Sequence, residues 1–546
     1  MREIWRIHPA DAAGAGRLAK SLGIHPVTAQ LLINRGIATP DDGRVFLEPA
    51  VCFLSDPFLL EGVSAAVERL LKAVKSRQRI VIFGDSDVDG LTASVILYEA
   101  LESLGGQVSA ISSNRIEDGY GLPLPTAKRL QTEADVLVIV DCGTNQPDLV
   151  QQLSSCGVDV IIVDHHLPLQ QPAKPFALIN PHCASSSHGR EFCSAGLSLK
   201  LAQALFQSTK NTCDLTAYLD LAALGTLADC SPYLGDNRIF LAEGLRRVIE
   251  TKRPGLQRLC AQMEVKTADA EAVLRRLIPR LNASGRLGDA RAIFHLLRQQ
   301  PGEIETWLSS AEQAHATTRQ LHKEMIGQAY AQIGRLHFKD QYVMVVSRAG
   351  WHQGLMGPLA SQLSQQYGRP AIAIAIDENQ ATGSGRCSGA SLNLLEMLKG
   401  CQELLLRFGG HAYACGLTLD RKHIDRFRQL VNERARACAS HLLPRQRWAD
   451  LDIPLNGIES AWVEETRRFS PFGRGNPEPM LLIRQVGIRL QSPRVAVVDD
   501  GVTQLTAKGI FPLLEADKRY DLLASPRLFK QQVWLAVGDV KPSGEL

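Results

Sequence analysis

Residues 79–90 read Arg-Ile-Val-Ile-Phe-Gly-Asp-Ser-Asp-Val-Asp-Gly and establish the pattern of the first large domain. The apolar, β-branched run at 79–84 predicts a buried strand, and a helical pattern follows at 91–104. Further strands are predicted at 107–112, 136–141 and 158–164, with helical segments between them. Strands that alternate with helices form parallel sheets with helices on both faces. The sequence therefore predicts an α/β domain.

Three of the predicted strands end in an aspartate: Asp85, Asp141 and Asp164. The carboxyl ends of parallel strands line the functional crevice of such sheets. The first strand end carries three alternating carboxylates, from Asp85 to Asp89, which repel one another unless a cation neutralises them. Mg²⁺ and Mn²⁺ suit carboxylate oxygens. An EF-hand calcium loop is excluded because Ile96 stands at the position of its final glutamate, whereas an acidic surface loop remains an alternative.

Two histidines and a fourth acidic segment extend this constellation. His165 and His166 directly follow Asp164, and imidazole is a ligand for Mn²⁺ and related ions. Asp229 closes the apolar segment 224–229. Each of these motifs alone has a structural explanation, such as a helix cap. Together they predict a two-metal site that hydrolyses phosphate esters, in which the ions generate a hydroxide and stabilise phosphoryl charge.

Composition narrows the class of protein without choosing a function. The 546 residues suggest three or four domains, and 45% hydrophobic with 21% charged residues is ordinary for a soluble globular protein. With a net charge of +3, a nucleic acid would have to be held by a local basic groove. No membrane span or signal peptide is expected, and the twelve scattered cysteines, without a CxxC pair, indicate reduced thiols in a cytoplasmic protein.

The rest of the chain divides into helical regions, a second α/β unit and a β-rich end. The predicted segments are short helices over 1–60, a helix at 61–75, a helical region at 194–297, one long helix at 302–335, strands at 341–346 and 370–376, a linker at 442–447, and β segments at 494–498 and 532–537. The last two fall in an alternating pattern over 481–546 that predicts a small β-barrel.

At Asp164-His-His166 the sequence resembles the DHH phosphoesterase superfamily and, within it, the RecJ family of single-stranded-DNA-specific exonucleases. The resemblance covers nearly the whole chain. It also rests on Asn-Arg-Ile-Glu-Asp-Gly-Tyr-Gly at 114–121, Pro-Arg-Leu-Asn-Ala-Ser-Gly-Arg-Leu-Gly-Asp at 279–289, Trp-His-Gln-Gly at 351–354, Gly-Ser-Gly-Arg at 383–386, Phe-Gly-Gly-His at 408–411 and Pro-Phe-Gly-Arg-Gly-Asn-Pro at 471–477.

The resemblance implies an α/β architecture: a parallel-sheet DHH domain and a smaller α/β DHH-associated domain, joined by a long helix, with a C-terminal OB-like β-barrel. The implied domains are a helical extension at 1–60, the DHH catalytic domain at 61–300, the connecting helix at 301–336, the DHH-associated domain at 337–440 and an OB-like nucleic-acid-binding domain at 441–546.

The resemblance also implies roles for individual residues around two Mn²⁺ or Mg²⁺ ions. Asp87 and Asp89 are expected as ligands, Asp141 as the bridge, and His165 and Asp229 as the residues that complete one ion's shell. Asp85, Asp164 and His166 are expected either to orient these ligands or to contact the scissile phosphate.

Other residues are expected to meet the substrate. Asn114, Arg115, Ser384 and Arg386 would face the 5′ end of the nucleic acid, where guanidinium groups pair with phosphate, and His411 would approach from the second domain. Arg280 and Arg286 either tie helices together or contact the backbone phosphates. Trp351 and His352 either close the core of the second domain or serve the site, and Tyr120 either stacks on a base or packs. Ser86, Asn145 and Ser194-Ala195 depart from the family's usual residues and bear on substrate preference.

The implied activity is a metal-dependent 5′-to-3′ exonuclease that degrades single-stranded DNA to mononucleotides in recombination and DNA repair. The implied partners are single-stranded DNA, a single-strand-binding protein and a helicase; the enzyme is expected to be a monomer away from membranes. One alternative is a phosphoesterase of the same superfamily acting on small molecules or short oligonucleotides. Another is a DNA-binding scaffold that has lost catalysis.

Overall fold

The structure of the chain is a computed structural model that describes residues 4–117, 119–169, 171–209, 214–298, 302–334, 341–387, 392–439, 446–512, 514–515 and 518–544. Its contacts define two compact units: residues 55–231 with 243–442, and residues 1–54 with 232–242 and 443–546. Three predicted domain boundaries, at 300, 336 and 440, lie outside the described residues, as do Asp118 of the 114–121 motif and residues 442–445 of the predicted linker.

The predicted parallel sheet is present in the larger unit. Its five strands lie in the order β3-β2-β4-β5-β6, and every neighbouring pair is parallel. The strands are β2 (Arg79–Gly84), β3 (Gln107–Ser112), β4 (Val136–Val140), β5 (Asp159–Val163) and β6 (Ala177–Ile179). The first four lie where the sequence predicts them. Three-residue β6 was not predicted, because so short a run carries no recognisable periodicity.

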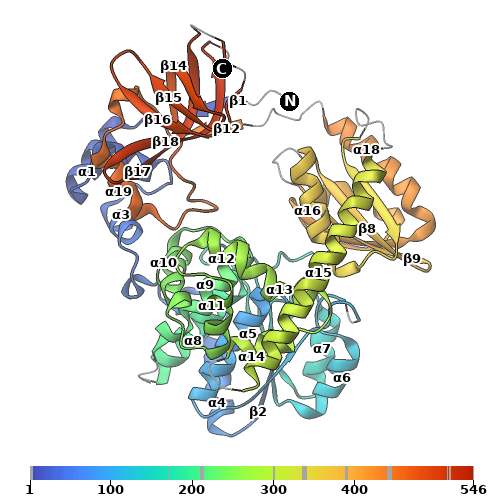
Figure 1. Cartoon of the computed structure of the whole chain (residues 1–546). Helices are drawn as coiled ribbons and strands as arrows, with labels where there is room; N and C mark the ends of the chain where they lie inside the picture. The colour runs from blue at the N-terminus through green and yellow to red at the C-terminus, as the bar shows by residue number, and fades with distance from the viewer. Residues whose placement is uncertain are drawn as a thin grey trace. The chain divides into compact units, whose positions relative to one another are not determined.

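Helices cover both faces of this sheet (Figure 1). On one face, Val81 and Phe83 pack in a core with α6 (Leu124–Glu133) and α7 (Pro147–Ser155). Helices α4 (Val63–Lys75), α5 (Val88–Ser103) and α8 (Ser194–Thr209) also pack against strands of the sheet. The helical region that follows contains α9 (Leu219–Ala228), α10 (Gly235–Ile249), α11 (Pro254–Gln262), α12 (Ala270–Arg276), α13 (Ile278–Arg286) and α14 (Arg291–Leu297).

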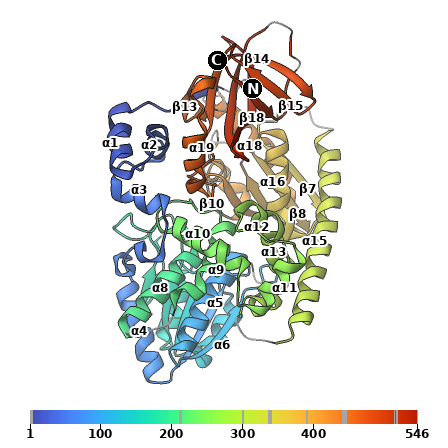
Figure 2. The same ribbon diagram turned by 60° about the vertical axis from the view of Figure 1, so that its left-hand side comes forward.

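A single long helix, α15 (Ile304–Ile333), follows as predicted (Figure 2). It leads into a mixed sheet of order β10-β11-β9-β8-β7, in which only β7 and β8 are parallel. The elements are β7 (Met344–Ala349), α16 (Met356–Tyr367), β8 (Ala371–Asp377), β9 (Gln380–Arg386), α17 (Leu394–Lys399), β10 (Leu405–His411), β11 (Ala414–Asp420) and α18 (Ile424–Ala439). Trp351 packs in a core with residues of α15 and α16, while buried residues of α17 and α18 belong to a second core. This second α/β domain was predicted.

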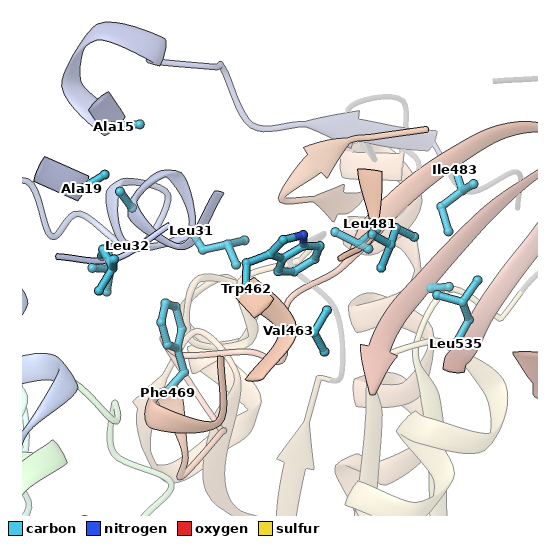
Figure 3. Close-up of a cluster of buried hydrophobic side chains, with 14 of the residues drawn as sticks. Ala15, Ala19, Leu31, Leu32, Trp462, Val463, Phe469, Leu481, Ile483 and Leu535 are labelled. Carbon is cyan, nitrogen blue, oxygen red and sulfur yellow. The ribbon is translucent and has the colours of Figure 1, made fainter. Parts of the chain in front are cut away.

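The smaller unit contains a closed barrel, as predicted. Strands β14, β15, β16, β18 and β17 pair in that order, and pairing of β14 with β17 closes the ring. Their bounds are β14 (Leu481–Ser492), β15 (Val495–Asp499), β16 (Gln504–Lys508), β17 (Tyr520–Phe529) and β18 (Gln532–Pro542), and β13 (Leu451–Asp452) pairs with β14. The core of the unit joins the barrel to the N-terminal helices, with Trp462 of α19 (Ser460–Glu465) lying near Leu31 and Leu481 (Figure 3).

The N-terminal 60 residues are not entirely helical, contrary to the sequence prediction. Helices α1 (Ala12–Leu22), α2 (Pro26–Ile33) and α3 (Pro40–Leu47) are present, but β1 (Ile4–Ile7) precedes them. This strand pairs in parallel with β12 (Gln446–Ala449), which takes up the last two residues of the predicted linker. A partner so distant in sequence leaves no local signal. In the described part of the chain, no helix is long and apolar enough to cross a membrane.

Candidate active site

The predicted acidic and histidine residues lie at the ends of three strands and two helices. Asp85 follows β2; Asp87 caps the N-terminus of α5, where its side chain accepts a bond from the Gly90 N–H at 3.1 Å. Asp89 lies in the first turn of that helix. The remaining residues are Asp141 after β4, Asp164, His165 and His166 after β5, and Asp229 at the end of α9.

Three of these side chains converge on a ring nitrogen of a fourth, His165. His165 Nε2 lies 3.4 Å from Asp141 Oδ1, 3.8 Å from Asp89 Oδ2 and 3.9 Å from Asp229 Oδ1. Asp89 and Asp141 are buried, at 3% and 2% exposure. Three carboxylates around one imidazole form a set of oxygen and nitrogen donors that suits a divalent ion such as Mn²⁺.

Asp141 belongs to two groups of potential metal ligands. Ligand atoms of Asp85, Asp87 and Asp141 lie within 4.8 Å of one another, and so do those of Asp141, His165 and His166. The backbone of Asp141 is left-handed, with φ 63°, a conformation that non-glycine residues retain where the surroundings enforce it. The carboxylate at this strained turn is shared between the two groups.

Burial and mutual repulsion perturb the acids of this cluster. Burial, with the charges of Asp229 and Asp87, raises the pKa of Asp89 to about 6. Burial, with the charges of Asp87 and Asp89, raises the pKa of Asp141 well above its ordinary value. Burial opposes the charged form of His165, but Asp229, Asp141 and Asp89 outweigh it and raise its pKa. A bound cation would relieve this repulsion, so the donor set fits a metal centre.

Asp85 is occupied by donors of the protein. Its Oδ1 accepts bonds from the Ser86 N–H at 2.8 Å, the Ser113 hydroxyl at 2.8 Å and Arg115 Nε at 2.9 Å, and its Oδ2 pairs with Arg115 Nη2. The same Nη2 lies 3.0 Å from Asp87 Oδ2. Asp85 therefore anchors the Arg115 guanidinium beside the metal-ligand candidates.

Asp164 holds the two histidines that follow it. Its Oδ1 accepts from the N–H groups of His165 and His166 at 2.8 and 3.1 Å and lies 2.7 Å from His166 Nδ1. Its Oδ2 accepts from the Thr144 N–H at 3.2 Å. Burial favours the neutral acid, but the charge and hydrogen bond of His166 hold the pKa of Asp164 well below its ordinary value. The Tyr120 hydroxyl lies 3.0 Å from His166 Nδ1 and donates to the Asp141 carbonyl at 3.1 Å.

Arginines from both domains of the larger unit gather next to this cluster. Arg386 Nη1 donates to Ser384 Oγ and to the Gly385 carbonyl, both at 2.8 Å. Burial lowers the pKa of Arg286 and of Arg386, and the positive charge of Arg115 adds to this effect in both. In the described part of the chain no ion pair joins Arg286 or Arg386 to a carboxylate. The charge of Asp87 offsets part of the lowering at Arg286. Two poorly solvated cations that no described carboxylate contacts form an environment suited to an anion.

The second domain approaches closely through the motif at 351–354. A Cβ at Gly354 would lie 2.1 Å from the Arg286 carbonyl oxygen, so only glycine permits this packing. His411, at the end of β10, has a lowered pKa, chiefly from burial and then from the charge of Arg386. Asp229, His165 and His166 also act on it electrostatically, so His411 lies in the electric field of the acidic cluster.

Other predicted residues have structural partners. Arg280 Nε lies 3.2 Å from Glu312 Oε1 of α15, and its Nη1 donates to the Arg276 carbonyl. Asn114 Oδ1 accepts from the N–H groups of Ile116 and Glu117, in a turn that packs on Gly288. Trp351 donates to Gln328 Oε1 at 2.7 Å in the core of the second domain.

Four supporting residues were not predicted. The Ser113 hydroxyl donates to Asp85, and the Ser194 hydroxyl donates to Asp141. The backbone N–H of Thr144 donates to Asp164. Asn180 Nδ2 donates to Thr144 Oγ1 and to the His166 carbonyl, both at 2.9 Å. Small polar residues are common in loops, so their presence alone does not predict a supporting role. Only Ser194-Ala195, which departs from the family's usual residues, stood out in the sequence.

Three family models match the chain. The DHH family N-terminal domain matches residues 79–226, the DHHA1 domain residues 340–437 and the RecJ OB domain residues 449–509. The fold and the acidic cluster thus define a protein of the DHH class that carries a DHHA1 domain.

Comparisons that span most of the chain define the family within this class. The chain is 34% identical over 491 residues to the single-stranded-DNA-specific exonuclease RecJ of Dickeya dadantii, covering 82% of each chain. It is 32% identical to the protein of the same name from Bacillus subtilis, covering 88% of this chain and 61% of the relative. It matches the crystal structure of Thermus thermophilus RecJ in complex with Mn²⁺ with a TM-score of 0.84 and 25% identity, over 100% of this chain and 80% of that one. The chain belongs to the RecJ family.

Proposed function

We propose that the chain is a two-metal phosphodiesterase that degrades single-stranded DNA from its 5′ end to mononucleotides, in recombination and DNA repair. The observation that carries this proposal is the position of Asp141, which is shared between two groups of potential ligands. A carboxylate shared in this way suits a pair of divalent ions, and two ions suit an in-line attack on a phosphodiester. The family relationship supports the same substrate class.

Five residues would hold the ions, Mn²⁺ or Mg²⁺: Asp87, Asp89, Asp141, His165 and Asp229. When bound, the ions would lower the pKa of a water molecule and stabilise charge on the phosphoryl oxygens. Asp164 keeps the His165–His166 turn in place, and Asp85 positions the Arg115 guanidinium. His166, whose charge acts on His411, and His411 itself would contact the scissile phosphate or donate to the leaving oxygen.

The arginines supply an argument for polarity. Arg115, Arg286 and Arg386 influence one another electrostatically beside the acidic cluster, and Ser384 bonds to Arg386. Guanidinium groups bind phosphate bidentately, so these three arginines would bind a terminal 5′-phosphate. The next phosphodiester would then lie over the metal ligands. Arg280 and Asn114 would act indirectly, because their hydrogen bonds hold helices and a turn.

The alternative is a phosphoesterase acting on small molecules or short oligonucleotides. The closed barrel favours the long substrate, since OB-type barrels bind single strands by stacking and by charge. We further propose that the enzyme is a cytoplasmic monomer that works with a helicase and a single-strand-binding protein.

Substrate length distinguishes the two readings. Purified protein with Mn²⁺ would be given a dinucleotide and a single strand of several tens of nucleotides. The proposed exonuclease should have a much larger kcat/KM on the long strand. A larger kcat/KM on the dinucleotide would favour the small-molecule phosphoesterase.

A further inference from the structure

A serine hydroxyl contacts the aspartate that the two ligand groups share. Ser194 opens α8, and its Oγ donates to Asp141 Oδ1 at 2.9 Å. Ser194 is completely buried, and Asp141 is 2% exposed. The bond is therefore formed in a dry environment, where a charge-assisted hydrogen bond is strong.

The same end of α8 also holds Asp89. The N–H of Ser194 donates to Asp89 Oδ2 and the N–H of Ala195 to Asp89 Oδ1, both at 2.8 Å. The positive end of the helix dipole favours a carboxylate at this position. The two backbone bonds need no particular side chain, but the bond to Asp141 requires a hydroxyl at position 194.

We propose that Ser194 is a positioning residue of the metal centre, whose hydroxyl fixes the Asp141 carboxylate for both ions. This inference rests on the proposed function. The backbone of Asp141 is already fixed, because its φ is 63° and its carbonyl accepts the Tyr120 hydroxyl. The side-chain torsions still need a restraint, since Asp87 and Asp89 repel the carboxylate. Ser194 supplies that restraint.

Ser194-Ala195 stands where the family resemblance leads one to expect a more glycine-rich stretch. Glycine at position 194 would keep the backbone bonds to Asp89 and lose the bond to Asp141. Residues that orient a metal ligand typically contribute about 10- to 100-fold in metal affinity.

The test is direct Mn²⁺ binding, measured by the loss of the free Mn²⁺ electron paramagnetic resonance signal. Ser194→Ala and Ser194→Gly should each raise the Mn²⁺ dissociation constant by about tenfold or more. Ser198→Ala is the matched control: Ser198 is equally buried in the same helix, and its hydroxyl has no hydrogen-bond partner among the described residues. This control should bind Mn²⁺ like the parent.

Activity measured against Mn²⁺ concentration gives a second readout. Ser194→Ala should need a higher concentration for half-maximal rate and recover much of the rate when Mn²⁺ is saturating, which a general folding defect would not do. Two Ser194 variants guard against one failing to fold. If the unsubstituted protein binds Mn²⁺ no more tightly than both Ser194 variants, the inference is overturned and the proposed function still stands. A parent that binds no Mn²⁺ would overturn both.

Discussion

Replacing Arg386 with glutamine tests the proposed recognition of the 5′ end. Arg386 is half-buried, donates to Ser384 Oγ and the Gly385 carbonyl, and has no carboxylate partner among the described residues. A charge-assisted hydrogen bond to phosphate contributes about 1.5–3 kcal/mol, which corresponds to about a 10- to 150-fold change in kcat/KM. Arg386→Gln should lose that much activity on a 5′-phosphorylated strand and lose little on a strand ending in a 5′-hydroxyl.

The assay compares kcat/KM for the two strands with parent and variant, so that it forms a thermodynamic cycle between the guanidinium and the phosphate. Arg280→Gln is the matched control, because Arg280 pairs with Glu312 of α15. The control should leave the preference for the 5′-phosphate unchanged. If Arg386→Gln slows both strands equally, or if Arg280→Gln removes the preference instead, the proposed phosphate site is wrong.

Three further predictions concern the metal centre and a buried ion-pair network, in which Arg253 pairs with Asp220 of α9 and Glu99 of α5. Asp141→Ala should reduce nuclease activity by at least about 1,000-fold, because the metal centre supplies most of the phosphoryl charge stabilisation. Binding of single-stranded DNA, measured by fluorescence anisotropy, should largely persist. Loss of DNA binding as well would contradict this role. Arg253→Met should lower the free energy of unfolding by about 3–5 kcal/mol, measured by thermal or urea unfolding. The substitution removes the cation that pairs with Asp220 and Glu99, whose side chains are only 6% and 10% exposed. A decrease under about 1 kcal/mol would show that these acids find other partners. Mn²⁺ at about 100 times its dissociation constant should stabilise the parent by about 2.7 kcal/mol, and Asp141→Ala should show little of this effect; equal stabilisation of both would place the ion elsewhere.

Several acidic residues of the site could be located from the sequence because their positions follow local rules. Asp85, Asp141 and Asp164 each come directly after a buried strand, and the ends of parallel strands meet at one edge of a sheet. The long helix and the alternating sheet-and-helix pattern are equally local. Hydrophobic periodicity predicts the strands and helices of the sheet, and the absence of proline from 302–335 predicts the long helix.

Contacts between distant segments could not be predicted in the same way. Ser194 reaches Asp141 across 53 residues, and β1 pairs with β12 near the other end of the chain. Arg280 and Arg286 lie in one motif and one helix, α13. Six residues of α-helix place them about 120° apart, so one meets Glu312 while the other lies beside Arg115 and Arg386. Which arginine faces the site depends on how the helix packs.

Digestion of end-labelled DNA tests the central claim most directly. Single strands labelled at the 5′ or the 3′ end, and a blunt duplex, would be incubated with the protein and Mn²⁺, with EDTA as the control. The 5′ label should appear as a mononucleotide from the start, the 3′-labelled strand should shorten progressively, and the duplex and the EDTA samples should remain intact. Release of the 3′ label first, equal digestion of the duplex, or activity in EDTA would contradict a metal-dependent 5′-to-3′ single-strand exonuclease.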